Sequence, residues 1–201
     1  MRSWLRTRTA WWALLAIGLL PLAWLLWRTL ADQLGANPAE TLIRATGDWA
    51  LRALCITLAV TPLRTVLGWP ELARFRRLLG LLTFGYAALH LLCYAVFDMG
   101  LDGGDIARDI AKRPFILVGF SAFVLLLALA ATSFNRAIRW LGAARWQVLH
   151  RAVYAVAVLA VLHFWWMRSG KRLYGEVLIY ALILAALLSW RVLRRLKQRP
   201  A

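Results

Sequence analysis

The stretch PFILVGFSAFVLLLALAAT, residues 114–132, decides the fold class of this chain. None of its 19 side chains carries a charge, and a helix of roughly 20 apolar residues is long enough to cross the hydrocarbon core of a bilayer. Because lipid offers no hydrogen-bond partners to a polypeptide backbone, such a stretch is expected to be helical in a membrane.

Five other apolar segments of similar length lie on either side of it, at about residues 10–30, 49–67, 78–97, 148–167 and 174–193. Together the six segments occupy most of the 201 residues, and 62% of the chain is hydrophobic. No remaining stretch is long enough for a soluble domain. The sequence therefore predicts an all-α integral membrane bundle of six transmembrane helices, forming a single domain over residues 1–201.

The first segment follows a basic tail and so has to be weighed against a cleaved signal peptide. The tail carries Arg2, Arg6 and Arg8. The apolar run at residues 11–30 is longer than the core of a typical signal peptide, and no clear cleavage site of small residues follows it. We expect it to be retained as the first spanning helix.

The positive charge is unevenly distributed and predicts the orientation. Six spans place both termini on one side, together with residues 68–77 and 133–147. The formal net charge is +16, and eight of the nine acidic residues lie in the loops of the opposite side. An excess of Lys and Arg marks the cytoplasmic face, so both termini are expected to be cytoplasmic.

Five cations depart from this pattern because they lie near the ends of spans four and five on the side poor in basic residues. They are Lys112, Arg113, Arg168, Lys171 and Arg172. One interpretation is that they simply extend toward the membrane interface. The other is that they meet an anion there, either the propionates of a haem or a docking partner.

All three histidines of the chain, His90, His150 and His163, lie inside predicted spans. Ionisable side chains at membrane depth are energetically costly and indicate function. A neutral imidazole ligates iron and other transition metals, whereas hydrogen bonding between helices is the alternative role. Three histidines on two helices, with none in a loop, favour ligation.

Spans three and five both run outward from the cytoplasm, and His90 and His163 lie near their outer ends at similar depth. They are therefore expected to bind one haem iron from opposite sides. His150 precedes His163 by 13 residues, or about 20 Å along a helix, so it cannot share that iron. His150 is instead a candidate ligand or contact at a second, inner site.

The inner site has basic residues but no second histidine. Arg76 precedes His90 by 14 residues and shares its helical face. The site could hold a haem with one histidine ligand, a quinone, or a flavin whose phosphate meets Arg76, Arg77 or Arg151. Thirteen residues rotate an ideal helix by about 140° from a shared face. Either span five is locally distorted, or His150 faces a different direction from His163.

Several segments resemble the MsrQ (YedZ) family, within the wider group of ferric-reductase-like membrane proteins that includes NADPH oxidases and STEAP proteins. The resemblance extends over nearly the whole chain and rests on its combination of motifs. They are Arg76-Arg77-x-x-Gly80-Leu81-x-x-Phe84-x-Tyr86-x-x-Leu89-His90-x-x-x-Tyr94, Lys112-Arg113-Pro114-Phe115-Ile116, Trp146-x-x-Leu149-His150-Arg151-x-x-Tyr154, Thr61-Pro62-Leu63-Arg64 and Gly35-Ala36-Asn37-Pro38. Relatives in the wider group carry paired histidines on the third and fifth helices, and this chain departs from that pattern by having Arg76.

The resemblance implies an electron-transfer subunit of the bacterial inner membrane. Such a protein takes electrons from the quinone pool, with haem b and FMN as cofactors. It passes them to MsrP, a periplasmic molybdopterin enzyme that catalyses the reduction of methionine sulfoxide in proteins. The absence of a nicotinamide-binding motif from the sequence agrees with electrons arriving from a quinol or from a separate reductase.

Two other classes of function compete with this interpretation. A stand-alone ferric or cupric reductase would use the outer haem to reduce a soluble metal complex without a protein partner. A transporter or scaffold would use the histidines for substrate binding or packing. A transporter is also expected to have broken helices near the membrane midplane, and the six predicted spans look continuous.

Overall fold

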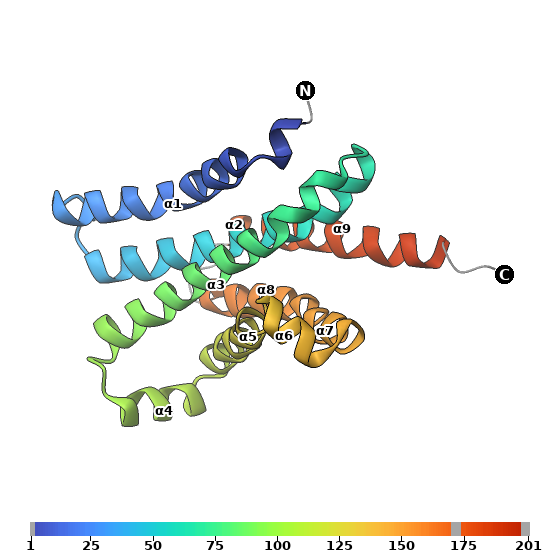
Figure 1. The fold of residues 1–201 in the computed structure, drawn as a ribbon. Coiled ribbons are helices and arrows are strands. Elements are labelled where there is room, and N and C mark those ends of the chain that lie inside the picture. Colours follow the sequence, from blue (N-terminus) through green and yellow to red (C-terminus); the bar gives the residue numbers. More distant parts are fainter. Residues whose placement is uncertain (1–2, 170–173, 198–201) are drawn as a thin grey trace. The chain divides into compact units, whose positions relative to one another are not determined.

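The computed structural model describes residues 3–169 and 174–197, and the elements within them are helices joined by short connections (Figure 1). The chain divides into two compact units, residues 1–102 and residues 103–201. Each unit contains its own candidate histidines, and each is described by itself.

In the described part of the chain, six helices are long and apolar enough to cross a membrane. They span Arg8–Leu30, Pro38–Val66, Pro70–Asp98, Pro114–Ala131, Ala143–Ser169 and Gly175–Lys197. Large apolar side chains point outward from them. On the first, Ile17 and Leu20 are each 61% exposed, as expected of surfaces that face lipid rather than water. The prediction of an all-α membrane bundle with six spans is confirmed.

Unit 1 contains the helices α1 (Arg8–Leu30), α2 (Pro38–Val66) and α3 (Arg76–Cys93). Short 3-10 turns at Ser3–Arg6 and Pro70–Phe75 precede α1 and α3, and a π-helical turn at Tyr94–Asp98 follows α3. The side chain of Asn37 accepts a hydrogen bond from the backbone N–H of Glu40, and Pro38 occupies the first position of α2. Both residues favour a helix start.

The start of α2 corrects one expectation. The apolar pattern predicts a span at 49–67, but the structure has a single helix from Pro38 to Val66. Helix α2 therefore extends eleven residues beyond the predicted span at its N-terminal end.

Helices α2 and α3 run antiparallel and pack closely along their length (Figure 1). Leu54 and Leu58 of α2 are 2% and 3% exposed. The hydroxyl groups of Thr57 and Thr83 lie 3.1 Å apart across the interface. Small polar side chains of this kind let spanning helices approach closely and hydrogen-bond to one another. The interface fixes the position of α2 against the histidine-bearing helix α3.

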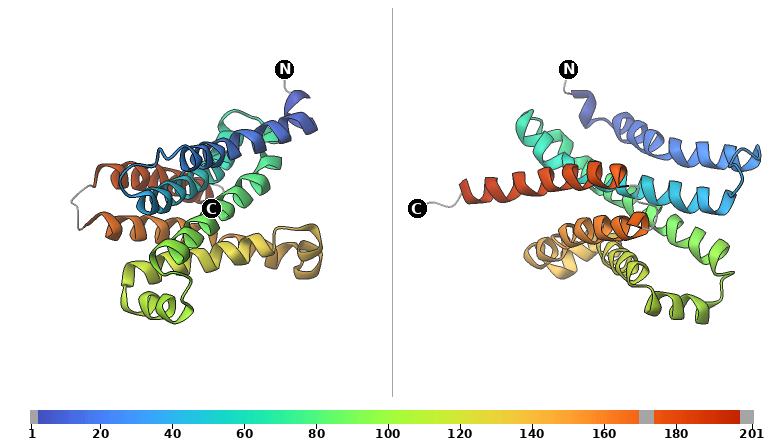
Figure 2. Two further views of the ribbon diagram at one scale, coloured as in Figure 1. Left: turned by 90° about the vertical axis from the view of Figure 1, so that its left-hand side faces the viewer. Right: turned by 180° about the vertical axis from the view of Figure 1, so that it is seen from behind.

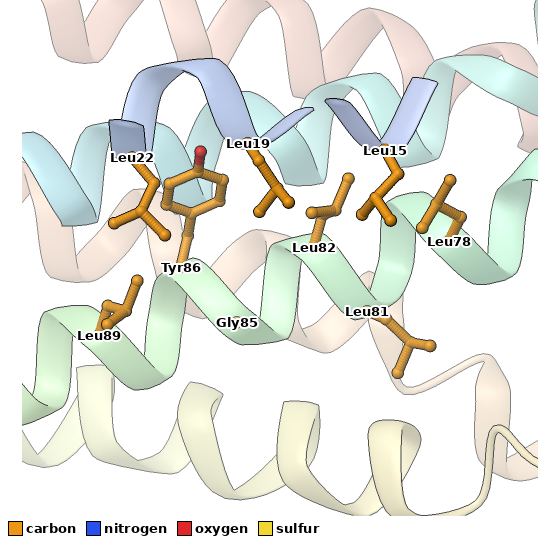
Figure 3. Close-up of a pocket in the computed structure, with 9 residues that line it drawn as sticks. All are labelled: Leu15, Leu19, Leu22, Leu78, Leu81, Leu82, Gly85, Tyr86 and Leu89. Atoms are coloured by element: carbon orange, nitrogen blue, oxygen red, sulfur yellow. The ribbon is translucent and has the colours of Figure 1, made fainter. Parts of the chain in front are cut away.

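Helix α1 is tied to α3 through Tyr86, whose hydroxyl group donates a hydrogen bond to the backbone oxygen of Gly18 at 2.7 Å. Figure 3 shows this side chain pointing from α3 toward α1, beside a cavity of about 350 Å³. Leucine side chains of both helices make up most of the cavity wall. Tyr86 thus has a packing role within unit 1.

Unit 2 contains α4 (Gly103–Lys112), α5 (Pro114–Ala131), α6 (Asn135–Leu141), α7 (Ala143–His150), α8 (Val153–Ser169) and α9 (Gly175–Lys197). The segment between the predicted spans at 78–97 and 114–132 thus includes helix α4, which Figure 2 shows joined directly to α5. Helix α8 packs against α5 and α9. Val156 and Ala157 of α8 are each 1% exposed, and Val177 of α9 is completely buried.

The fifth span is interrupted by a tight turn at Arg151 and Ala152, which separates α7 from α8. The backbone N–H groups of Ala152 and Tyr154 donate to the carbonyls three residues earlier, at 2.9 and 3.0 Å. Bonds of this spacing wind a helix more tightly than an α-helix does. The predicted fifth span at 148–167 lies within Ala143–Ser169. Of the two alternatives for His150 and His163, a local distortion of this span is the one that the structure has.

Candidate functional site

His90 lies near the C-terminal end of α3, and its imidazole is half-buried against α2. Its Nδ1 lies 2.8 Å from the backbone oxygen of Ile43. Because a carbonyl oxygen can only accept a hydrogen bond, Nδ1 must carry the proton. In the neutral ring, Nε2 is then the nitrogen with a lone pair.

His163 has the same arrangement in unit 2. It lies in α8, and its Nδ1 is 2.7 Å from the backbone oxygen of Phe115, in the first turn of α5. The ring of Phe115 is also tilted against the imidazole, with the ring centroids 6.4 Å apart. As in His90, the proton is on Nδ1 and the lone pair is on Nε2.

Taken one unit at a time, each of these two histidines has the hydrogen-bonding pattern that suits a metal-ligating imidazole. A histidine that binds a metal through one ring nitrogen commonly donates its other N–H to a backbone carbonyl, which orients the ring and raises its basicity. Haem iron takes four ligands from the porphyrin and needs only one or two from protein. In the described residues, no group of three or more His, Cys, Asp and Glu side chains is placed to hold a metal ion.

His150 has a different environment, at the end of α7. Its Nε2 lies 3.1 Å from the hydroxyl oxygen of Thr132, which itself donates to the backbone oxygen of Ala128 at 2.7 Å. The Nε2 of His150 is therefore engaged by a side-chain hydroxyl group, whereas His90 and His163 contact a backbone oxygen through Nδ1.

Trp146 holds His150 in place from the same helix. Its ring stacks on the imidazole with centroids 3.9 Å apart and planes inclined by 27°. The indole Nε1 donates to the backbone oxygen of Thr132 at 2.9 Å. His150, Trp146 and Thr132 thus form a connected group at the start of the fifth span. The group suits hydrogen bonding to a polar, flat molecule better than iron ligation through Nε2.

The other predicted inner-site residues are arginines at helix ends. Arg76 and Arg77 begin α3, and Arg151 lies in the turn after α7; all three are exposed. Arg76 and His90 are on one continuous helix, about 21 Å apart at 1.5 Å per residue. The placement of Arg76 in the first turn agrees with an interfacial position, and its role at an inner site stays a prediction.

Two of the five outer cations form ion pairs within unit 2. Arg113 Nε lies 2.9 Å from Asp109 Oδ1, and Arg168 Nη2 lies 3.0 Å from Glu176 Oε2. The Arg168 side chain is only 14% exposed and lies over the ring of Phe164 at 5.3 Å. The Lys112 residue is exposed. Lys171 and Arg172 lie outside the described residues.

Arg168 could either bind a haem propionate or serve only as a structural ion pair with Glu176, and mutagenesis distinguishes these two roles. If the pair with Glu176 is its main role, Arg168→Gln and Glu176→Gln should lower stability by a similar amount, on the order of 1 kcal/mol. Neither change should then alter the haem content. Thermal unfolding and the haem-to-protein ratio of both variants check this. A loss of haem confined to Arg168→Gln would instead support contact with a propionate.

The structure also places residues at the histidines that the sequence analysis did not single out. They are Thr132 beside His150 and two helical glycines, Gly47 and Gly119, beside His90 and His163. Glycine in the middle of a helix costs about 1 kcal/mol relative to alanine. That cost was the available signal for the glycines, whereas nothing in the sequence marks the hydroxyl group of Thr132.

Residues 46–161 match the family described as the ferric reductase like transmembrane component. With six spanning helices and histidines inside them, the match defines the class of this membrane protein. The chain is 60% identical to the protein-methionine-sulfoxide reductase heme-binding subunit MsrQ of Polaromonas naphthalenivorans (strain CJ2), over 96% of this chain and 91% of that protein. It is 51% identical to MsrQ of Bordetella parapertussis, over 94% and 91%. The chain belongs to the MsrQ family.

Similarity to this family extends to more distant members. The chain is 45% identical to MsrQ of Caulobacter vibrioides, over 86% of this chain and 81% of that protein. No solved structure matches the chain. The resemblance inferred from the sequence motifs is confirmed at the level of the family.

Proposed function

We propose that this chain is the haem-binding membrane subunit of a protein-methionine-sulfoxide reductase system, in which His90 and His163 ligate haem b. The observation that carries the proposal is the tautomer of these two residues. Each Nδ1 is committed to a backbone carbonyl, at 2.8 and 2.7 Å, so each Nε2 has the lone pair that iron requires. The relatives are named as heme-binding subunits, which supports the same role here.

In this proposal the chain passes electrons outward across the bacterial inner membrane. The donor is the quinone pool, and the acceptor is a periplasmic MsrP-type molybdopterin enzyme that reduces methionine sulfoxide in proteins. A bound haem supplies one-electron exchange at its iron. The surplus of Lys and Arg at the termini and at residues 68–77 and 133–147 supports cytoplasmic termini, which puts His90 and His163 toward the periplasmic side.

The inner end is proposed to receive the electrons at FMN or a quinone. His150 is held by Thr132 and Trp146, and an imidazole at this position suits proton exchange with a quinol or a flavin near neutral pH. Arg76, Arg77 and Arg151 supply positive charge that would suit the phosphate of FMN. Lys112, Lys171 and Arg172 are retained as candidate contacts for the partner enzyme.

A spectroscopic experiment on the detergent-purified full chain tests this function. The reduced-minus-oxidised visible spectrum should be that of a b-type cytochrome. A short-chain quinol should reduce the haem, and a purified MsrP-type enzyme with a methionine sulfoxide substrate should reoxidise it. A colourless protein, purified from cells with adequate haem supply, would rule out the proposal.

A stand-alone ferric reductase is the second candidate, and the description of the matched family favours it. In that case the reduced protein should transfer electrons to ferric citrate at a rate that the MsrP-type enzyme does not influence. Reoxidation that is rapid with the partner and its substrate, and slow with ferric citrate, would exclude this candidate.

A further inference from the structure

Gly119 of α5 lies directly against the imidazole of His163. A Cβ atom at position 119 would be 2.7 Å from Nδ1, 2.8 Å from Cε1 and 3.1 Å from Cγ of that ring. Two of these distances are below 3.0 Å, closer than real Cβ atoms approach other heavy atoms. Any side chain at this position would therefore have to displace the ring or the helix.

Gly47 of α2 has the same relation to His90, with slightly more room. A Cβ atom there would be 3.0 Å from Nδ1 and 3.1 Å from Cε1 of the His90 ring. The ring would have to give way by a few tenths of an ångström. The contact is tight in both units, but it is tighter at Gly119.

The two glycines are also equivalent in their relation to the carbonyl that holds each histidine. Ile43 precedes Gly47 by four residues, and Phe115 precedes Gly119 by four residues. Residues four apart share one face of an α-helix. Each imidazole therefore packs against the backbone of the neighbouring helix at the glycine, and the carbonyl oxygen that it contacts lies one turn before that glycine. A carbonyl oxygen has two lone pairs, so it can accept from the histidine as well as within the helix.

We propose that Gly47 and Gly119 are positioning residues that seat the ligand histidines against the backbone of the neighbouring helix. The missing side chain lets Nδ1 reach the carbonyl oxygen, and that hydrogen bond fixes the tautomer and ring orientation in which Nε2 meets the iron. The inference rests on the proposed function, since it concerns how haem ligands are held. The same arrangement of glycine, backbone carbonyl and histidine is assigned to both units of the chain.

The energetic cost of glycine strengthens this assignment. Alanine is the better helix former by about 1 kcal/mol, so Gly→Ala stabilises a helix wherever the added methyl group fits. It fits at Gly85 of α3 and at Gly175 at the start of α9, where a Cβ atom would meet nothing within 4 Å. Loss of function on Gly119→Ala therefore cannot come from a weakened helix.

The experiment compares Gly119→Ala and Gly47→Ala with the matched controls Gly85→Ala and Gly175→Ala in the purified full chain. Disturbing the outer-shell partner of a metal-ligating histidine typically costs about 10–100-fold in metal affinity. We expect Gly119→Ala to lower haem affinity by about that factor, Gly47→Ala to lower it less, and both controls to match the wild type. Haem titration of the apoprotein measures the effect.

Two spectroscopic readouts separate positioning from a general packing defect. Loss of the Nδ1–carbonyl bond makes the imidazole a weaker donor to ferric iron, so the midpoint potential of the remaining haem should shift upward. The g-values of its low-spin ferric EPR signal should shift as well, since ring orientation changes. The controls should shift neither.

The outcomes distinguish this inference from the function on which it rests. A wild type without haem would remove the proposed function itself. A wild type that binds haem through His90 and His163, together with a Gly119→Ala variant that matches Gly85→Ala in affinity, potential and EPR signal, would overturn the positioning role alone. Should Gly119→Ala fold too poorly to study, Gly47→Ala carries the same test with a smaller expected effect.

Discussion

Replacing His90 or His163 with alanine is expected to abolish the b-type spectrum of the purified protein. Each change removes the nitrogen proposed to ligate the iron together with the Nδ1 contact to Ile43 or Phe115. We expect haem affinity to fall by more than the roughly 10–100-fold that loss of an outer-shell partner typically costs, so the haem-to-protein ratio should drop sharply. Absorbance of the reduced protein relative to protein concentration measures it.

Rescue by imidazole separates ligation from packing in these variants. A His90→Gly variant leaves a ring-sized space, and added imidazole should restore a low-spin spectrum if the missing group is an iron ligand. A packing role predicts no such response. Full retention of haem and of its spectrum by both His90→Ala and His163→Ala would contradict the ligand assignment.

His150→Ala is expected to have the second large effect, on the delivery of electrons rather than on the haem. The variant should keep the dithionite-reducible b-type spectrum, because His90 and His163 are intact. Reduction by a quinol or through FMN should slow by about 100-fold, within the range for loss of a group that hydrogen-bonds or exchanges a proton with a reacting molecule. Stopped-flow reduction of the haem by each donor measures the rate.

Graded changes around His150 provide the control. Trp146→Phe keeps an aromatic ring for stacking but removes the N–H that donates to Thr132 O, and it should cost less than His150→Ala. Thr132→Val removes the hydroxyl group that hydrogen-bonds to Nε2, so it should release the ring and resemble His150→Ala more closely. A His150→Ala variant reduced at the wild-type rate by both donors would exclude an inner site at this residue.

Much of the fold follows from the sequence because a bilayer leaves few choices. Apolar runs such as residues 114–132 have to be helical, and their number and approximate limits can be read directly. The helix ends were harder. Helix α2 begins at Pro38 because Asn37 caps it, and a polar first turn is invisible to a search for apolar runs. The break after His150 was signalled only indirectly, by the awkward 140° rotation between His150 and His163.

The candidate site was predictable in part for the same kind of reason. Histidines are rare enough at membrane depth to stand out without any structure. The groups that orient these histidines cannot be recognised in the same way. The partners of His90 and His163 are the backbone oxygens of Ile43 and Phe115, and every residue has such an oxygen. The sequence could not show which oxygen would be reached. The Glu176 partner of Arg168 was equally hidden, since both residues look like ordinary charges at a membrane interface.

His90 and His163 hydrogen-bond to backbone atoms rather than to side chains. This determines which neighbouring positions tolerate substitution. A random library across α2 and α5 should accept many apolar residues at Ile43 and Phe115, because the acceptor oxygen is retained whatever the side chain. The neighbouring glycines should accept almost none. In a collection of related sequences, the residues whose backbone oxygens hold the histidines would then vary freely. Only the two neighbouring glycines would be invariant.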